Sequence, residues 1–326
     1  MSVLNILFVG SEAVASSIAK KSDSRDVDNY IYKDLKSDGS FSTISILRPN
    51  NYPEKPKSFF TSLTISDFGI IEVNKVDSVF GEVVVSMASA GIENGFILIN
   101  PIEGGWVDEA QVKELVEQAG LVNWKFIEND GVVIREGLVD VLNKIENKEE
   151  EGFVVAVDQA FTVKGVGLVA IGNVQRGKIS KHDKVIFAGS EGNAITRSLQ
   201  VMDLDVDVAR VGDRVGLALR SSGGFREDIL GKGSILADSE KRFTVELKSE
   251  FELKRAAFQK SGLSEGDVIH FCSDLQFGVG RVSKITERVF VEWESPIVLN
   301  KISKRDPLII QLEANPRIIG SAKYNK

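Results

Sequence analysis

The apolar pattern of this 326-residue chain changes abruptly at Gly152, and the change limits the folds that the chain can adopt. Before Gly152, short apolar runs alternate with segments whose apolar residues recur at helical spacing, as Val112, Leu115, Val116 and Ala119 do. Such alternation predicts a parallel sheet with helices on its faces. After Gly152, short runs rich in Val, Ile and Leu alternate with glycine turns, which predicts antiparallel barrels or sandwiches.

The expected elements divide the chain into three parts. The strands predicted in the first part are Ile6–Val9, Thr43–Leu47, Phe68–Val73 and Gly95–Ile99. The helices predicted there are Ser16–Lys21, Lys57–Leu63, Phe80–Ala90, Asp108–Ala119 and Gly137–Asn147. The charged stretch NKEEEG then predicts a linker near residues 148–152. We therefore expect an α/β, P-loop-like (Rossmann-like) domain over residues 1–148, followed by β-barrels over 152–238 and 241–326.

Composition excludes several classes of function. The formal net charge is −7, so any nucleic-acid contact requires a local patch rather than a basic surface. Cys272 is the only cysteine, which excludes an intrachain disulfide, and His182 and His270 lack the partners of a catalytic or zinc site. No apolar segment approaches the roughly 20 residues that span a bilayer, and no basic region precedes the N-terminal apolar run. We expect a soluble, cytoplasmic protein.

The N-terminal stretch ILFVGSEAVASSIAKKS has the order of a phosphate-binding turn. An apolar strand meets Gly10, and a helix of small residues follows. The phosphate loop G-x-x-x-x-G-K-[ST] also requires a second glycine and a lysine, and both are missing here. The scaffold of a nucleotide site is therefore predicted without its usual chemistry.

The second part of the chain carries a family resemblance. Residues 157–187, VDQAFTVKGVGLVAIGNVQRGKISKHDKVIF, resemble the start of the second domain of the elongation factor Tu and SelB family of translational GTPases, and residues 197–238 continue the match. The block that ends in QLEANPRIIGSAKY is similar to the family's third domain. Residues 51–73 with Gly81 and Glu82 resemble most a divergent archaeal SelB-like branch with degraded nucleotide motifs, the proposed pyrrolysine-type factors among them.

The resemblance assigns the remnants of a nucleotide site. In the phosphate loop Gly10 is retained, Ala15 replaces glycine, Ser16 replaces the lysine and Ser17 stands at the magnesium-binding hydroxyl. Because the lysine neutralises phosphate charge, its loss removes a charge-assisted contact of about 1.5–3 kcal/mol.

Two further motifs of the family are also altered. The motif D-x-P-G-H falls on RPNNY, which places Arg48 at the magnesium aspartate, Asn51 at the γ-phosphate glycine and Tyr52 at the catalytic histidine. The motif N-K-x-D keeps Asn100 and an acid, Glu103, around a proline. The resemblance thus implies a degenerate GTPase-like domain, or pseudo-GTPase, with no catalytic residue, no metal site and no bound cofactor. GTP with Mg²⁺ is disfavoured.

The resemblance also assigns a pocket for the aminoacyl end of tRNA in the second domain. The matching residues are Asp158, Phe161, Gln200 and Arg214, of which Gln200 and Arg214 depart from the family's usual residues. Phe161 could stack on an apolar moiety and Arg214 could pair with a phosphate or carboxylate. The alternative is that Phe161 is barrel core and Arg214 a surface charge.

Three functions remain open. The first is a monomeric, elongation-factor-like protein that binds tRNA, aminoacylated in the family, and can meet the ribosome, without GTP control and without contact to a membrane. The second is a translational GTPase with an aberrant phosphate loop, in which Lys20 or Lys21 replaces the missing lysine. The third is a regulatory pseudo-GTPase that binds a protein.

Overall fold

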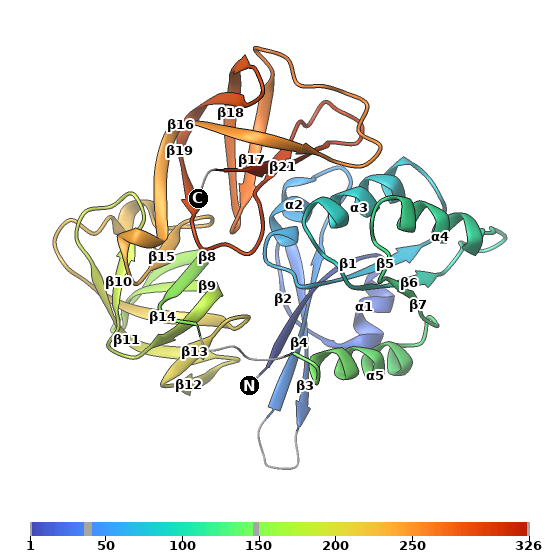
Figure 1. The fold of residues 1–326 in the computed structure, drawn as a ribbon. Helices are drawn as coiled ribbons and strands as arrows, with labels where there is room; N and C mark the ends of the chain where they lie inside the picture. Colours follow the sequence, from blue (N-terminus) through green and yellow to red (C-terminus); the bar gives the residue numbers. More distant parts are fainter. Residues whose placement is uncertain (1, 36–40, 146–149, 325–326) are drawn as a thin grey trace. The chain divides into compact units, whose positions relative to one another are not determined.

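The structure is a computed structural model that describes residues 2–35, 41–145 and 150–324. The chain packs into two compact units, each formed from several segments. The first unit comprises residues 1–147, 253–263 and 307–323, and the second comprises 148–252, 264–306 and 324–326. Figure 1 shows helices among the strands of the N-terminal part and β-structure in the remainder of the chain.

The first unit contains a seven-stranded sheet in the order β2-β3-β4-β1-β5-β6-β7. Its strands are β1 Val3–Val9, β2 Lys20–Ser24, β3 Val27–Leu35, β4 Phe41–Pro49, β5 Phe68–Val73, β6 Gly95–Ile99 and β7 Lys125–Phe126. The strands β4, β1, β5, β6 and β7 are parallel, whereas β3 runs antiparallel to β4 and β2 antiparallel to β3. The sheet is therefore mixed rather than purely parallel as predicted.

In the described part of the first unit, four helices lie between strands of this sheet and a fifth follows β7. They are α1 Glu12–Ile18, α2 Lys57–Leu63, α3 Ser78–Ser89, α4 Glu109–Gln118 and α5 Gly131–Leu142. The predicted helix Ser16–Lys21 is wrong, because the Ser11 side chain caps a helix that begins four residues earlier and Lys20 already belongs to a strand. The predicted helix Gly137–Asn147 also begins earlier, since Asp130 accepts hydrogen bonds from two backbone N–H groups at its start. Residues 146 and 147 of that prediction lie outside the described residues.

Helices cover both faces of the sheet, with α1 and α5 on one face and α2, α3 and α4 on the other (Figure 1). On the first face, side chains of α1 and α5 share a buried core with alternate residues of the strands, among them Ile6, Phe8, Phe68 and Ile70. Because side chains alternate along a strand, Leu7 and Ile71 point to the opposite face, where they are also buried.

The strands after Gly152 form two β-structures. The first contains β8 Phe153–Val163, β9 Gly167–Ser180, β10 Lys184–Phe187, β11 Ala194–Val201, β12 Leu204–Val206, β13 Val208–Arg210, β14 Arg214–Ser221 and β15 Ile235–Ala237. Its strands pair in the order β10-β15-β8-β9-β14-β11, and an additional pairing of β10 with β11 joins the first strand of this order to the last. The strands surround an apolar core. The second is a closed barrel in the order β16-β19-β18-β17-β20-β21.

The last barrel completes the predicted fold class. Its strands are β16 Phe243–Arg255, β17 Val268–Ser273, β18 Gln276–Ile285, β19 Val289–Asn300, β20 Leu308–Ile310 and β21 Ile318–Lys323. Beyond Phe153, the only helices among the described residues are two single 3-10 turns, Glu227–Ile229 and Glu240–Arg242. The prediction of an α/β domain followed by β-barrels is confirmed. None of the described helices is long and apolar enough to span a membrane.

Candidate functional site

Residues 10–17, which align with the phosphate loop, form a helix start instead of a wide loop. Ser11 is the N-cap of α1, and its Oγ accepts a hydrogen bond from Val14 N at 3.3 Å. Ser17 Oγ donates to Val14 O at 2.7 Å, so the hydroxyl at the magnesium position is used within the helix. Ala15 is fully buried in the core, and Ser16 is exposed on the outer face of α1.

A carboxylate of the chain itself lies against this segment. Glu72, near the end of β5, accepts a hydrogen bond from Ser11 N through Oε2 and another from Asn100 Nδ2 through Oε1, both at 2.5 Å. A Cβ atom at Gly10 would lie only 2.6 Å from Glu72 Oε2, so only glycine allows this close approach. A phosphate placed here would compete with Glu72 for the same N–H group and would face its negative charge.

Arg48 binds the loop from the other side. Its Nε donates to Gly10 O at 2.8 Å, and its Nη1 donates to Asp28 Oδ2 at 3.2 Å and Asn50 Oδ1 at 3.0 Å. Burial alone would raise the pKa of Asp28, but hydrogen bonds from Ser24, Asn50 and Lys21 outweigh it and hold that pKa below its ordinary value. Asp28 is therefore an anion inside this network.

Lys21, one of the lysines considered as a substitute for the missing one, belongs to the same network. Its Nζ lies 2.9 Å from Glu12 Oε1 and 3.1 Å from Asp28 Oδ2. Hydrogen bonds to these two carboxylates raise its pKa above the ordinary value. Lys21 is thus engaged by the protein's own acids.

The other aligned remnants lie in different surroundings, and of them Asn100 meets the phosphate-loop segment through Glu72. Asn51 is exposed and has a left-handed backbone with φ of 56°. Tyr52, at the place of the catalytic histidine, donates its hydroxyl to Glu82 Oε1 at 2.7 Å. Glu103 is exposed in the turn after β6, whereas Asn100 is held by Glu72. Among the described residues, no group of His, Cys, Asp and Glu could hold a metal ion.

In the second unit, the structure brings Asp158 and Arg214 together. Arg214 Nη2 donates to Asp158 Oδ2 at 3.1 Å, and Lys232 Nζ lies 3.9 Å from Asp158 Oδ1. Asp158 is the extra residue of a bulge between Val157 and Gln159 in β8. A bulge re-aims a side chain, and here it places one carboxylate between two cations. We call Asp158, Arg214 and Lys232 the barrel charge cluster; all three side chains are partly buried.

The other two assigned residues, Gln200 and Phe161, lie in different surroundings. Gln200 pairs with Gly216 across β11 and β14, so it shares a face with Arg214 two residues along, and its Nε2 donates to Asp205 Oδ1 at 3.0 Å. Phe161 is 43% exposed and lies outside the apolar core of the barrel. Phe161 is therefore not a residue of the barrel core, and Arg214 is a partly exposed charge paired with Asp158.

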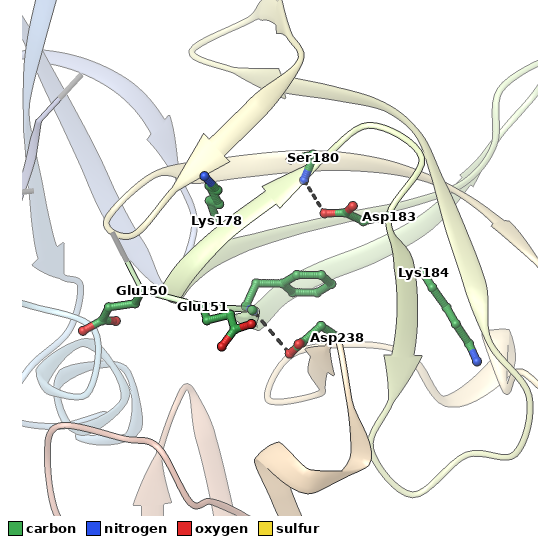
Figure 2. A pocket seen from close by; sticks show the side chains of 9 residues that line it. Glu150, Glu151, Lys178, Ser180, Asp183, Lys184 and Asp238 are labelled. Atoms are coloured by element: carbon green, nitrogen blue, oxygen red, sulfur yellow. Dashed lines mark hydrogen bonds between the residues drawn. The ribbon is translucent and has the colours of Figure 1, made fainter. Parts of the chain in front are cut away.

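The second unit also contains an open pocket of about 610 Å³. Figure 2 shows its side chains, which include Glu150, Lys178, Asp183 and Asp238. Asp183 accepts from Ser180 N at 2.7 Å and Asp238 from Phe153 N at 3.3 Å (Figure 2). These carboxylates stabilise the surrounding turns, and Glu150 pairs with Arg176 at 3.4 Å. We therefore assign no ligand to this pocket.

Three residues of these networks were missed by sequence reasoning. Glu72 had a signal, because it is an acid inside the apolar run FGIIEV. Asp28 lies in the polar stretch that forms β2 and β3, and Lys232 lies in a glycine turn; neither position differs locally from an ordinary surface charge.

Comparisons with known proteins place the chain near translation elongation factors. No protein-family model matches it. An uncharacterized protein of Methanocaldococcus jannaschii is 28% identical over 284 residues, which cover 87% of this chain and 85% of the relative. The selenocysteine-specific elongation factor of the same organism is 24% identical over 188 residues, 57% of this chain and 39% of the factor. The chain thus spans less than half the length of that factor.

A solved structure shares the architecture of the whole chain. It is elongation factor SelB from Methanococcus maripaludis in complex with the GTP analogue GppNHp. The TM-score is 0.77 at 18% identity, and the match covers 99% of this chain and 78% of the other. The similarity shows a common fold.

Proposed function

Because the chain is a relative of the SelB-type translation elongation factors, we propose that it binds the acceptor end of a tRNA through the barrel of β8–β15, without control by GTP. The barrel charge cluster carries this proposal. We further propose that the protein acts in the cytoplasm as a monomer, takes aminoacylated tRNA, and meets the ribosome through it.

The cluster has the chemistry that an RNA end requires. Arg214 and Lys232 lie beside the same carboxylate, so an incoming phosphate or carboxylate would meet two cationic side chains at one place. The half-exposed ring of Phe161, three residues from Asp158, offers a face for stacking with a base or an amino-acid side chain. Gln200 adds an amide that can donate or accept. A local patch of this kind also fits a chain whose net charge is −7.

The phosphate-loop region supports the absence of GTP control. Glu72 holds Ser11 N, Arg48 holds Gly10 O, and Lys21 is paired with Glu12 and Asp28. The Ser11 N–H group, the Arg48 guanidinium and the Lys21 ammonium group are thus each engaged by another part of the chain. GTP could shift the protein between two conformations only by binding one of them more tightly than the other, and a site that does not bind GTP provides no such difference.

The proposal is tested by titrating labelled tRNA, aminoacylated and deacylated, into the full chain. We expect binding at low ionic strength that weakens at least about tenfold between 50 and 200 mM salt, because phosphate contacts release counterions. Arg214→Ala should weaken binding by about 1–3 kcal/mol, the value of a charge-assisted hydrogen bond. Adding GTP and Mg²⁺ should leave the affinity unchanged.

Arg226→Ala is the matched control for this titration. Arg226 also pairs with an aspartate of the second unit, Asp228 at 2.7 Å, but this pair is exposed and neither residue belongs to the barrel charge cluster. Its loss should leave tRNA affinity unchanged. If the unmodified protein shows no salt-sensitive tRNA binding, the carrier role is wrong and a protein-binding pseudo-GTPase becomes the better interpretation.

A further inference from the structure

The segment between β4 and α2 is held by a buried ion pair within the first unit. Glu82 of α3 and Arg317, at the residue before β21, form this pair, with Nη2 of Arg317 2.6 Å from Glu82 Oε1. The Glu82 side chain is 5% exposed and that of Arg317 18%. Residues 51–53 contact both partners.

Glu82 is the acceptor at the centre of this arrangement. Oε1 accepts from the Tyr52 hydroxyl at 2.7 Å, and Oε2 accepts from the backbone N of Arg317 at 2.8 Å. Arg317 Nε donates to both carboxylate oxygens at 3.0 Å. The carboxylate is thereby fully engaged, which a buried charge requires.

Arg317 in turn holds the loop. Its Nη1 donates to Pro53 O at 2.8 Å, and its guanidinium lies 5.6 Å from the centroid of the Tyr52 ring. The Tyr52 ring also packs against Phe59 of α2, with centroids 4.3 Å apart. Burial, together with the neighbouring Glu82 carboxylate, raises the pKa of Tyr52, so its hydroxyl remains a neutral donor. Arg317 therefore contacts this loop twice: it donates a hydrogen bond to the backbone at Pro53, and its guanidinium lies over the ring of Tyr52.

We propose that Tyr52, Glu82 and Arg317 form a fixed latch that holds residues 51–53 in a single conformation in the free protein. Any movement that carries Tyr52 and Pro53 away would break two charge-assisted hydrogen bonds and leave a buried ion pair incompletely satisfied. A buried ion pair favours the conformation in which both charges are paired, because any other conformation leaves a buried charge without its partner, which costs free energy. The latch depends only on contacts inside the first unit and is independent of tRNA binding.

Hydrogen–deuterium exchange of the full chain, read by mass spectrometry, tests the latch. In peptides covering residues 50–56 of the unmodified protein, the amides of Asn50 and Lys55, which donate to Asp26 O at 2.9 Å and Asn51 O at 2.7 Å, should exchange slowly and as one population. Arg317→Ala should accelerate their exchange at least about fivefold, while peptides of β1 and β5 keep their rates, since local opening is governed by local contacts. Tyr52→Phe, which removes one hydrogen bond and keeps the ring, should give a smaller acceleration in the same peptides.

Arg135→Ala is the matched control, because Arg135 of α5 also donates to backbone carbonyl groups, those of Ser17 and Ile18 at 2.8 Å, and also lies over a tyrosine ring, that of Tyr32 at 4.9 Å. It should leave the exchange of residues 50–56 unchanged. Rapid or two-population exchange of these residues in the unmodified protein would overturn the latch. So would a folded Arg317→Ala protein with unchanged exchange there. If Arg317→Ala does not fold, unchanged exchange in Tyr52→Phe decides against the latch in the same way.

Discussion

Arg317→Met is expected to lower the free energy of unfolding of the first unit by about 3–5 kcal/mol, because it strands the Glu82 carboxylate in a buried position. Urea denaturation followed by the fluorescence of Trp124, which is buried in this unit, measures the loss. Replacing Trp106 and Trp293 with phenylalanine in every variant leaves Trp124 as the only reporter.

Two further variants separate the buried charge from general loss of packing. The triple variant Tyr52→Phe, Glu82→Met, Arg317→Met should recover most of the stability, since apolar side chains of similar volume often replace a buried ion pair without loss. Arg25→Met, at the partly exposed pair with Asp23, should cost under about 1 kcal/mol. A loss of similarly small size in Arg317→Met would show that the Glu82 carboxylate finds solvent and that the ion pair is not a structural centre.

Mg²⁺-GTP is expected to bind the unmodified protein with a Kd weaker than about 1 mM, which corresponds to a binding free energy no more favourable than roughly −4.1 kcal/mol. Isothermal titration calorimetry measures this directly. The physical reason is that the loop N–H at Ser11 is paired with Glu72, whose charge would face the phosphate, and that the Arg48 guanidinium is bound to Gly10 O and Asp28. Micromolar binding would contradict the proposed loss of GTP control.

Ser16→Lys restores the residue type of the family motif and serves as the companion variant. It should leave GTP binding as weak as before, because residue 16 lies on the exposed face of α1 and Glu72 remains against the loop. Lysine is a good helix former, so the variant should fold normally, and a circular-dichroism melt checks this. Recovery of micromolar affinity by this one change would show that the missing lysine, rather than Glu72, limits binding.

The succession of an α/β sheet and β-barrels follows from local patterns in the sequence. The apolar runs at Phe68–Val73 and Gly95–Ile99 coincide with β5 and β6, and Lys57–Leu63 coincides with α2. The spacing of apolar residues predicts these elements because each element buries one face, or both faces, against its neighbours. The hairpin of β2 and β3 escaped prediction because β2, with the sequence KKSDS, is an edge strand whose exposed side chains show no apolar alternation.

The nucleotide region illustrates where local reasoning ends. Missing motif residues could be read directly at Ser16, Arg48 and Tyr52. The sequence did not reveal which residue lies against the phosphate-loop segment, because Glu72 reaches Ser11 from a strand 61 residues away along the chain. Only the pairing of β1 with β5 brings the two together.

The same distinction applies to the ion pairs. The apolar pattern predicted the order of the domains, and the resemblance to the elongation-factor family assigned the degraded motifs and a cation at position 214. Tertiary structure alone paired Arg214 and Lys232 with Asp158, and Arg317 with Glu82 across 235 residues. An isolated charge in a sequence is compatible with solvent or with burial, and the packing of distant elements decides between them because a buried charge requires a partner.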